Sequence, residues 1–216
     1  MNVASKIKRG RKFDQVLAGA RVIFLRDGFE GASVDDIARE AGVSKATLYS
    51  YFPDKRLLFM EVAKAECRRQ AESAAEFDDE GASPRKVLTI AGRRIGDLAM
   101  SDMGRGVFRI CLAEADRFPE IGREFYESGP LLVRNRLCDY LQRAMDRGQL
   151  EIEDVPLAAE QFSELCKADI QVRRLFKQDE TCSAQKRNKI VKSAVDMFLA
   201  RYATEETKIA DAAETA

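Results

Sequence analysis

The sequence lacks histidine entirely and has only five prolines among its 216 residues. Histidine is the most common general base and metal ligand near neutral pH. Its absence therefore excludes a Ser-His-Asp hydrolase and a histidine-ligated metalloenzyme, although it leaves carboxylate-based chemistry open. No stretch approaches the roughly 20 apolar residues that a membrane-spanning helix needs. With 45% hydrophobic and 33% charged residues, the composition is typical of a helix-rich globular protein.

Cysteine is also scarce and scattered. There is no Cys-x-x-Cys pair among the five cysteines, which are Cys67, Cys111, Cys138, Cys166 and Cys182. An odd number without close pairing argues against a disulfide framework and against a zinc site, so we expect neither a metal nor a cofactor. The N-terminus lacks the apolar run of a signal peptide, and we expect a cytoplasmic protein that does not bind membranes.

Positive charge is concentrated at the N-terminus although the chain as a whole is balanced, with 36 basic and 36 acidic residues. Residues 5–12 contain no acid and five cations, namely Lys6, Lys8, Arg9, Arg11 and Lys12. Such a basic arm suggests contact with phosphates, and an ordinary solvated terminus is the alternative. Residues 204–216 are polar and are expected to form a disordered tail.

Apolar residues recur at helical spacing along most of the chain, and no alternating strand pattern is present. We therefore expect an all-α fold with about nine to ten helices in its larger, C-terminal part. Helices are predicted over 11–27, 34–41, 45–51, 55–77, 84–101, 104–116, 119–128, 130–147, 156–177 (with a possible break near residue 167) and 183–202. A small domain over 1–56 is expected, then the connecting helix 55–77, then a larger domain over 78–203.

Residues 29–56 carry the most informative pattern, FEGASVDDIAREAGVSKATLYSYFPDKR. A tight turn at Gly42 joins two short helices, because glycine tolerates backbone conformations that a Cβ disfavours. The residues that can pack together and fix the crossing angle are Ile37, Ala38, Val43 and Leu48. The free face of the second helix is then polar, which suits a major groove. A helical hairpin with a merely solvated face is the alternative.

The spacing of this segment resembles the N-terminal domain of the TetR family of regulators. The matching positions are Phe29, Ser33, Val34, Ile37, Ala38, Ala41, Gly42, Val43, Ser44, Thr47, Leu48, Tyr49, Tyr51, Phe52 and Lys55. The resemblance implies a helix-turn-helix whose second helix reads double-stranded DNA. The implied DNA-binding residues are Ser33, Ser44, Lys45, Ala46, Thr47, Tyr49, Ser50, Tyr51 and Lys55. Among them Lys45, Thr47, Tyr49 and Ser50 are candidates for the groove, and Ser33, Tyr51 and Lys55 for phosphates.

The remainder resembles the AcrR- or AefR-like C-terminal domains of the same family. The segments that carry this likeness are 108–115 (FRICLAEA), 117–120 (RFPE), 125–130 (FYESGP), 158–162 (AAEQF) and 166–169 (CKAD). This likeness implies a domain that binds a small-molecule effector and pairs with a second copy of the chain, without naming the effector.

An apolar stripe on the last predicted helix supports a homodimer. Its members are Val191, Ala194, Val195, Phe198 and Tyr202. Such a face needs a partner, either a second protomer or the core of the same chain. Two heads about 34–36 Å apart would meet successive major grooves of a pseudo-palindromic site.

The effector pocket is expected among the middle helices. Its candidate residues are Met100, Met103, Phe108, Leu112, Phe125, Leu132, Cys138, Phe162 and Cys166, although ordinary core packing is the alternative for each. The sequence thus predicts a one-component repressor that a small molecule releases from its operator, and not an enzyme. Two other hypotheses stay open: a thiol-based redox or electrophile sensor on the same fold, and a helical adaptor that does not bind DNA.

Overall fold

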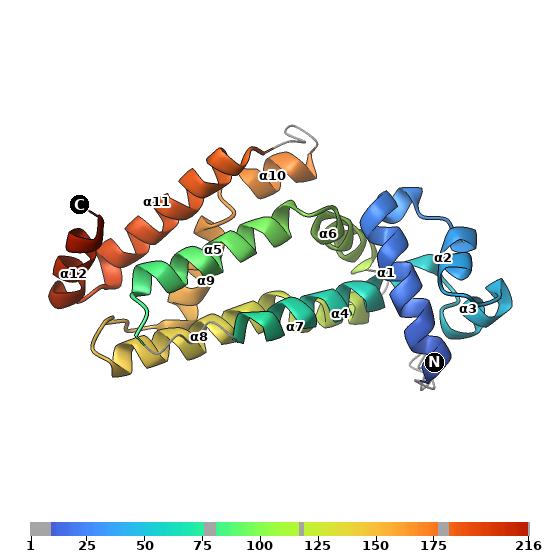
Figure 1. The fold of residues 1–216 in the computed structure, drawn as a ribbon, viewed down its shortest axis with the longest axis horizontal. Helices are drawn as coiled ribbons and strands as arrows, with labels where there is room; N and C mark the ends of the chain where they lie inside the picture. Colours follow the sequence, from blue (N-terminus) through green and yellow to red (C-terminus); the bar gives the residue numbers. More distant parts are fainter. Residues whose placement is uncertain (1–9, 76–80, 117–118, 177–181, 216) are drawn as a thin grey trace. The chain divides into compact units, whose positions relative to one another are not determined.

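The computed structural model describes residues 10–75, 81–116, 119–176 and 182–215 (Figure 1). Within these ranges every regular element is a helix, and the one extended pairing is an isolated antiparallel bridge between Leu150 and Ala203. The predicted all-α class is therefore confirmed. Three residues of the basic arm, Lys6, Lys8 and Arg9, lie outside the described residues.

The helices follow the predicted order with small shifts at their ends. Their bounds are α1 Arg11–Gly31, α2 Val34–Glu40, α3 Lys45–Tyr51, α4 Lys55–Ala75, α5 Pro84–Met100, α6 Asp102–Glu114, α7 Pro119–Ser128, α8 Pro130–Asp146, α9 Val155–Leu165, α10 Ile170–Leu175, α11 Ala184–Tyr202 and α12 Glu205–Thr215. The predicted break near residue 167 is present, because α9 ends at Leu165 and α10 begins at Ile170. At Gly28, where α1 was predicted to end, φ is +70° and the helix kinks.

Local side-chain chemistry explains where the two short helices begin. The Ser33 hydroxyl accepts a hydrogen bond from the Asp36 amide, and the Ser44 hydroxyl accepts one from the Thr47 amide. Each serine satisfies a backbone N–H that the helix itself leaves without a partner. Between the helices, Gly42 has a φ of +63°, which a residue with a Cβ adopts only under strain. The predicted turn therefore forms as the sequence indicates.

Contacts divide the chain into two compact units. The head unit lies within Met1–Cys67 and Asp102–Phe125, and the body unit within Arg68–Ser101 and Tyr126–Ala216. This division differs from the predicted boundary near residues 56 and 78, since α6 and most of α7 join the head. The chain passes between the two units three times, within α4, between α5 and α6, and within α7.

A single hydrophobic core holds the head unit together. It contains buried side chains from α1, α2, α3 and α4, and α6 adds Met103, Val107, Ile110 and Cys111. Aromatic rings fill its centre, with the Phe24 and Phe59 centroids 4.8 Å apart in an edge-to-face arrangement. A Cβ on Gly106 of α6 would lie 3.0 Å from the ring of Phe59, so this glycine allows α6 to approach α4 closely. The helix-turn-helix and α6 therefore share one core.

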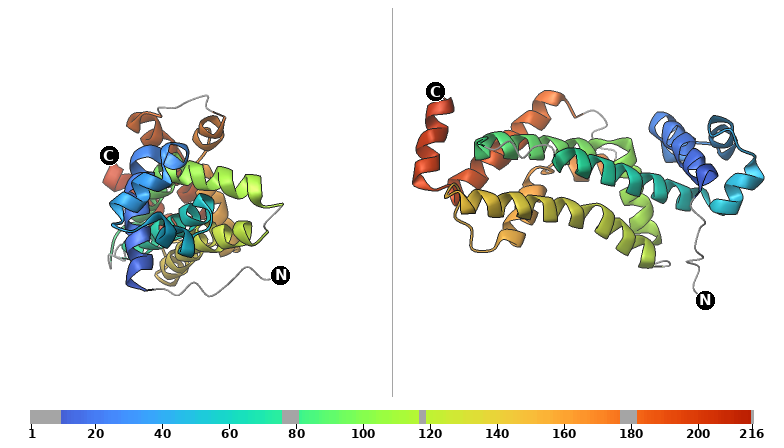
Figure 2. Two further views of the ribbon diagram at one scale, coloured as in Figure 1. Left: turned by 90° about the vertical axis from the view of Figure 1, so that its right-hand side faces the viewer. Right: turned by 60° about the horizontal axis from the view of Figure 1, so that its bottom comes forward.

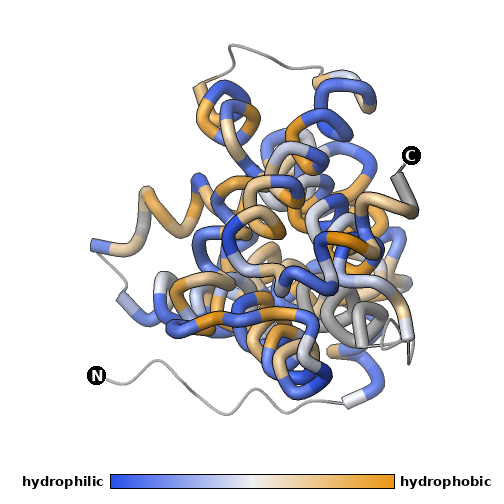
Figure 3. The backbone as a smooth tube through the Cα atoms, turned by 90° about the vertical axis from the view of Figure 1, so that its left-hand side faces the viewer, coloured by the Kyte–Doolittle hydropathy of each residue, from blue (hydrophilic) through white to orange (hydrophobic). Residues whose placement is uncertain are grey.

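The body unit has its own core, built from α5, α8, α9 and α11. Figures 1 and 2 show α5 and α11 running side by side. A Cβ on Gly92 of α5 would lie 2.9 Å from Cys166 and from Val191, which shows how closely α5 packs against its neighbours. Hydrophilic and hydrophobic residues alternate along each helix in Figure 3, as expected when one face of each helix is buried and the other is solvated.

The C-terminal segment corrects the sequence prediction. Residues 204–216 were expected to be disordered, but Glu205–Thr215 forms α12. The Arg85 guanidinium on α5 binds Asp211 of α12 through Nε and Nη2, and binds Asp196 of α11 at 2.6 Å through Nη1. The Thr204 hydroxyl caps the first turn by accepting from the Thr207 amide. A polar composition alone did not reveal this anchoring because Arg85 is distant in sequence.

No helix among the described residues is long and apolar enough to cross a membrane.

The contact between α1 and the end of α2 generates the first prediction. A Cβ on Gly19 would lie 2.6 Å from the Ala41 backbone nitrogen, so a Gly19→Ala variant must separate the two helices. We expect a loss of about 1–3 kcal/mol in the free energy of unfolding, measured by urea denaturation. Gly31→Ala, whose Cβ would meet only the Asp27 side chain at 3.4 Å, is the matched control and should be near neutral. Equal stability of the two variants would contradict this packing.

Candidate nucleic-acid interface and body cavity

The recognition helix predicted from sequence, α3, is anchored by few side chains, chiefly the buried Leu48 and the partly buried Tyr51. Leu48 is 1% exposed, whereas Lys45, Ala46, Tyr49 and Ser50 are exposed. A two-turn helix held along one side in this way presents its other sides to the outside. This geometry matches a helix that enters the major groove.

The hydroxyl groups of α3 differ in whether they already make hydrogen bonds within the protein. Ser50 donates its only proton to the Thr47 carbonyl at 2.6 Å, and Ser44 shares a hydrogen bond of 2.9 Å with the Thr47 hydroxyl. These groups first serve the helix itself, as serine and threonine commonly do. Tyr49 is 46% exposed and stands out as the large amphipathic side chain of the exposed face.

Tyr51 and Ser33 have structural contacts that the sequence did not show. The Tyr51 ring packs edge-on against Phe13 of α1, with centroids 6.0 Å apart. Tyr51 therefore contacts α1. The Ser33 hydroxyl donates to the Asp36 carboxylate at 2.6 Å, and this bond lowers the pKa of Asp36. Phosphate contact by Tyr51 or Ser33 stays a prediction.

Lys55 joins two helices. Its ammonium donates to the carbonyls of Phe29 at 2.8 Å and of Ala32 at 3.0 Å, and lies 4.5 Å from the centroid of the Phe29 ring. Cations are favoured at helix C-termini because carbonyl groups there lack partners. Two of the three ammonium protons are used, so Lys55 holds the start of α4 against the end of α1. Its predicted phosphate contact stays a prediction.

Lys45, the first residue of α3, forms an ion pair with Asp35 of α2. Both side chains are more than half exposed, at 56% and 59%. The cation that the sequence assigns to the groove is therefore held by an acid on the neighbouring helix.

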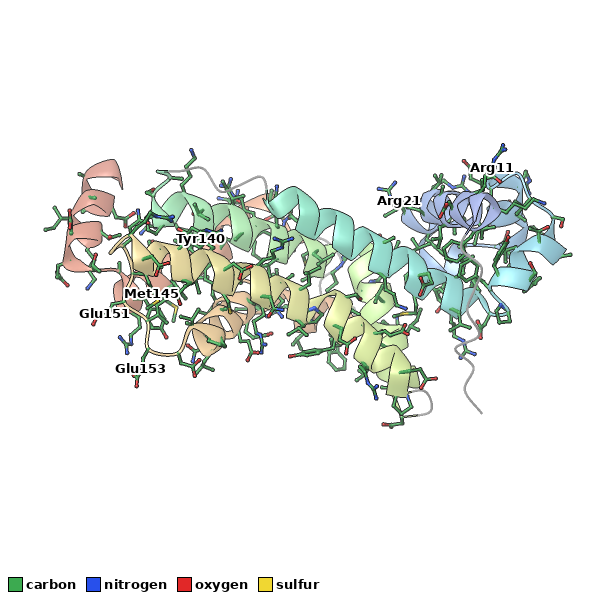
Figure 4. The ribbon with its side chains drawn as sticks, turned by 90° about the horizontal axis from the view of Figure 1, so that it is seen from below. Arg11, Arg21, Tyr140, Met145, Glu151 and Glu153 are labelled. Atoms are coloured by element: carbon green, nitrogen blue, oxygen red, sulfur yellow. The ribbon has the colours of Figure 1, made fainter. Side chains whose placement is uncertain are left out.

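Further basic residues lie on α1 and at the start of α4. Arg11 and Arg21 are labelled on α1 in Figure 4, and Arg11 is exposed together with Lys12. The Arg56 guanidinium binds Asp54 at 2.6 Å and lowers the pKa of that carboxyl. Most cations of the head that surround α3 are thus engaged by neighbouring groups.

A cavity of about 100 Å³ lies within the body unit, among α5, α9, α10 and α11. Its lining residues are Arg93, Gly96, Asp97, Cys166, Ile170, Ala184, Arg187, Asn188 and Val191. Arg187 approaches Asp97 at 3.3 Å and donates to the Cys182 carbonyl at 2.6 Å. The volume is well below the roughly 300–1,000 Å³ of drug-sized pockets, so it suits only a few water molecules or a very small ligand.

The predicted pocket residues are not gathered in this cavity, which contains only Cys166 among them. Met103, Phe108, Leu112 and Phe125 belong to the head unit, whereas Met100, Leu132, Cys138 and Phe162 belong to the body unit. Met103 and Phe162 are buried in the two cores, and Leu112 is 71% exposed. Sequence periodicity missed the cavity because its arginines looked like solvated surface. Its one available signal was the Gly92/Gly96 spacing on α5.

The stripe predicted for the dimer interface lies inside the protomer. Val191, Ala194, Val195 and Phe198 are at most 3% exposed and pack in the body core, where the Phe198 and Phe162 centroids are 5.3 Å apart. Tyr202 is half-buried and contacts Phe198. Helical periodicity identified an apolar face correctly but could not show that α5 and α9 of the same chain cover it.

The buried thiols disfavour a redox sensor. Burial raises the pKa of Cys111 and of Cys166 to about 12, and it also raises the pKa of Cys138. Protonated thiols are poor nucleophiles, so none of these three has the properties of a reactive cysteine. The side chain of Cys67 lies outside the described residues.

In the described part of the chain, two short helices joined by a glycine turn, with the second helix exposed, have the arrangement of a helix-turn-helix. Two family models match the chain: residues 16–62 match the bacterial regulatory proteins of the tetR family, and residues 86–204 match the AefR-like transcriptional repressor C-terminal domain. The chain therefore belongs to the TetR family, with an AefR-like C-terminal domain, and is a DNA-binding transcriptional regulator.

Individual relatives agree with this assignment. The repressor AcnR of Corynebacterium efficiens is 34% identical over 76 residues, which cover 35% of this chain and 40% of that protein. A TetR-family regulator from Mesorhizobium loti is 27% identical, with a TM-score of 0.77 over 90% of this chain and 98% of that one. The flavonoid-responsive regulator FrrA is 32% identical, with a TM-score of 0.62 over 91% and 100% of the two chains.

The exposure of Tyr49 gives the second prediction. A Tyr49→Ala variant should fold normally, because the side chain is 46% exposed, and should bind its target duplex about 10–100-fold more weakly in fluorescence anisotropy. Ser50→Ala is the control, since the Ser50 proton is already used within α3. If Tyr49→Ala binds like the unmodified protein while Ser50→Ala loses affinity, our assignment of the groove-facing residues is wrong.

Proposed function

We propose that this protein is a homodimeric repressor that a small-molecule effector releases from a pseudo-palindromic operator. The exposed polar face of α3, mounted on the core shared by α1–α4 and α6, is the observation that carries this proposal. A rigid core matters because groove contacts need a fixed approach angle. Membership of the TetR family and the likeness to the repressor AcnR support it.

A second protomer is proposed to pack on the outer face of α11. Four residues at helical spacing face away from the body core along this helix: Ile190, Ser193, Met197 and Ala200. Met197 is 57% exposed, and Leu157 of the neighbouring α9 is 49% exposed. The small Ser193 and Ala200 would allow close approach of a partner helix. A dimer with two head units is needed because one short helix makes few contacts with the groove.

Met197 tests the proposed dimer. A Met197→Glu variant should keep its helix content, because the side chain is exposed in the protomer, yet should dissociate to monomers at micromolar concentration in sedimentation velocity. Leu25→Glu on α1, where the leucine is 47% exposed, is the control and should stay dimeric. A Met197→Glu dimer as tight as the unmodified one would place the interface elsewhere.

Effector release is proposed to work as a population shift. An effector that binds the body unit better in one conformation changes the head spacing through the three chain passages between the units. Because α6 belongs to the head core but follows α5 of the body directly, a movement of α6 displaces the helix-turn-helix. The observed cavity is small, so a larger effector requires the body to open.

Selection of bound fragments from genomic DNA tests the proposed function. The purified protein should enrich fragments that share two half-sites about one helical turn apart, and their affinity should fall steeply with salt concentration as counterions are released. Transcription from the adjoining promoter should rise when the gene is deleted. A Lys45→Ala/Tyr49→Ala double variant is the control and should enrich nothing. Failure of the unmodified protein to enrich any duplex at low ionic strength would overturn the proposal.

A further inference from the structure

The head unit carries no net positive charge outside its N-terminal arm. Residues 13–67 contain seven lysines and arginines and nine aspartates and glutamates, and residues 102–125 contain four and five. DNA-binding domains usually present an excess of basic residues, which attract any duplex regardless of its sequence. Apart from the arm, the head therefore gains little affinity from non-specific phosphate contact.

Acids are placed directly against the cations in this head. Ion pairs join Arg26 to Asp27, Arg39 to Asp36, Lys45 to Asp35, Arg56 to Asp54 and Lys64 to Glu61. In the four pairs other than Lys45–Asp35, the partners lie one to three residues apart in sequence. The Lys45–Asp35 pair instead connects α2 with the first residue of α3, on the face assigned to DNA.

From this geometry we propose that Asp35 is a specificity-determining residue. In the free protein its carboxylate holds the Lys45 ammonium away from other anions. Asp35 is not required to cap α2, since the amide at the cap is that of Asp36 and its acceptor is Ser33. With a carboxylate that is 59% exposed and no capping duty, Asp35 acts mainly through charge.

Asp35 and the DNA phosphates compete for Lys45. This competition lowers the affinity for a random duplex more than the affinity for a duplex that contains the operator sequence. A phosphate that takes Lys45 leaves the Asp35 carboxylate unpaired beside a polyanion, which is unfavourable. A matched duplex compensates, because Lys45 gains a base-edge acceptor or Asp35 gains a cytosine amino donor. A random duplex does not place such a base-edge partner within reach of Lys45 or Asp35. Asp35 therefore weakens non-specific binding more than operator binding.

An Asp35→Asn variant tests this inference, which rests on the proposed function. Dissociation constants are measured by fluorescence anisotropy for a selected genomic fragment and for a random duplex of equal length, over a range of salt concentrations. We expect about five- to tenfold tighter binding to the random duplex, a change of about twofold or less for the selected fragment, and a salt slope for the random duplex steeper by about one. The ratio of the two affinities thus falls.

Two controls separate this mechanism from a general charge effect. Glu40→Gln removes another exposed carboxylate from the same helix, and it should preserve the affinity ratio. In a Lys45→Ala background, Asp35→Asn should no longer change the ratio, because the competition needs both partners. Circular dichroism checks the fold of each variant.

The outcomes distinguish this inference from the proposed function. If the unmodified protein prefers no duplex, the proposed function fails and takes the inference with it. Suppose that the unmodified protein binds the selected fragment more tightly than the random duplex. If Asp35→Asn then leaves the ratio of the two affinities unchanged, strengthens binding to both duplexes equally, or behaves like Glu40→Gln, only the role of Asp35 is overturned.

Discussion

Burial of α6 in the same core as the helix-turn-helix is the constraint on which the rest of the structure depends. Met103, Val107 and Ile110 pack with residues of α1 and α4, and Gly106 allows the approach to Phe59. This core sets the position of α3 through Leu48 and ties it to a helix that continues directly from the body. Close-packed protein interiors transmit displacements instead of absorbing them. The chain that leaves the body at residues 101–102 enters the head core within one helical turn, at Met103, so the proposed release by an effector needs no additional linker.

Most of the positive charge near α3 in the head is neutralised by neighbouring groups. Local ion pairs neutralise most cations near α3, and the ammonium of Lys55 serves the end of α1. In the proposed function, affinity would then depend on specific contacts from α3 and on the exposed cations Arg11 and Lys12 at the start of α1. Such a distribution favours selectivity over tight binding to any duplex, which suits a regulator that must find few sites among many.

Features that depend on residues close together in the chain were predictable from the sequence, whereas features that depend on residues far apart were not. The turn at Gly42 was predicted, and it depends only on residues within four positions, as do the caps at Ser33 and Ser44. Periodicity also located the apolar stripe of α11, but whether a second chain or α5 and α9 cover such a stripe depends on tertiary packing. The same limit applies to α12, whose anchor at Arg85 lies 126 residues from Asp211. The pairing of Lys45 with Asp35 was likewise invisible, since a helical pattern does not show which side chains meet across a turn.

The shared core can be tested directly by hydrogen exchange of the native protein at increasing denaturant concentrations. If α6 belongs to the head, the amides of residues 103–111 should open with the same free energy and the same denaturant dependence as those of α1 and the first turns of α4. Exchange of α6 together with α5 and α8, independently of α1, would contradict the account and would place the helix-turn-helix on a core of its own.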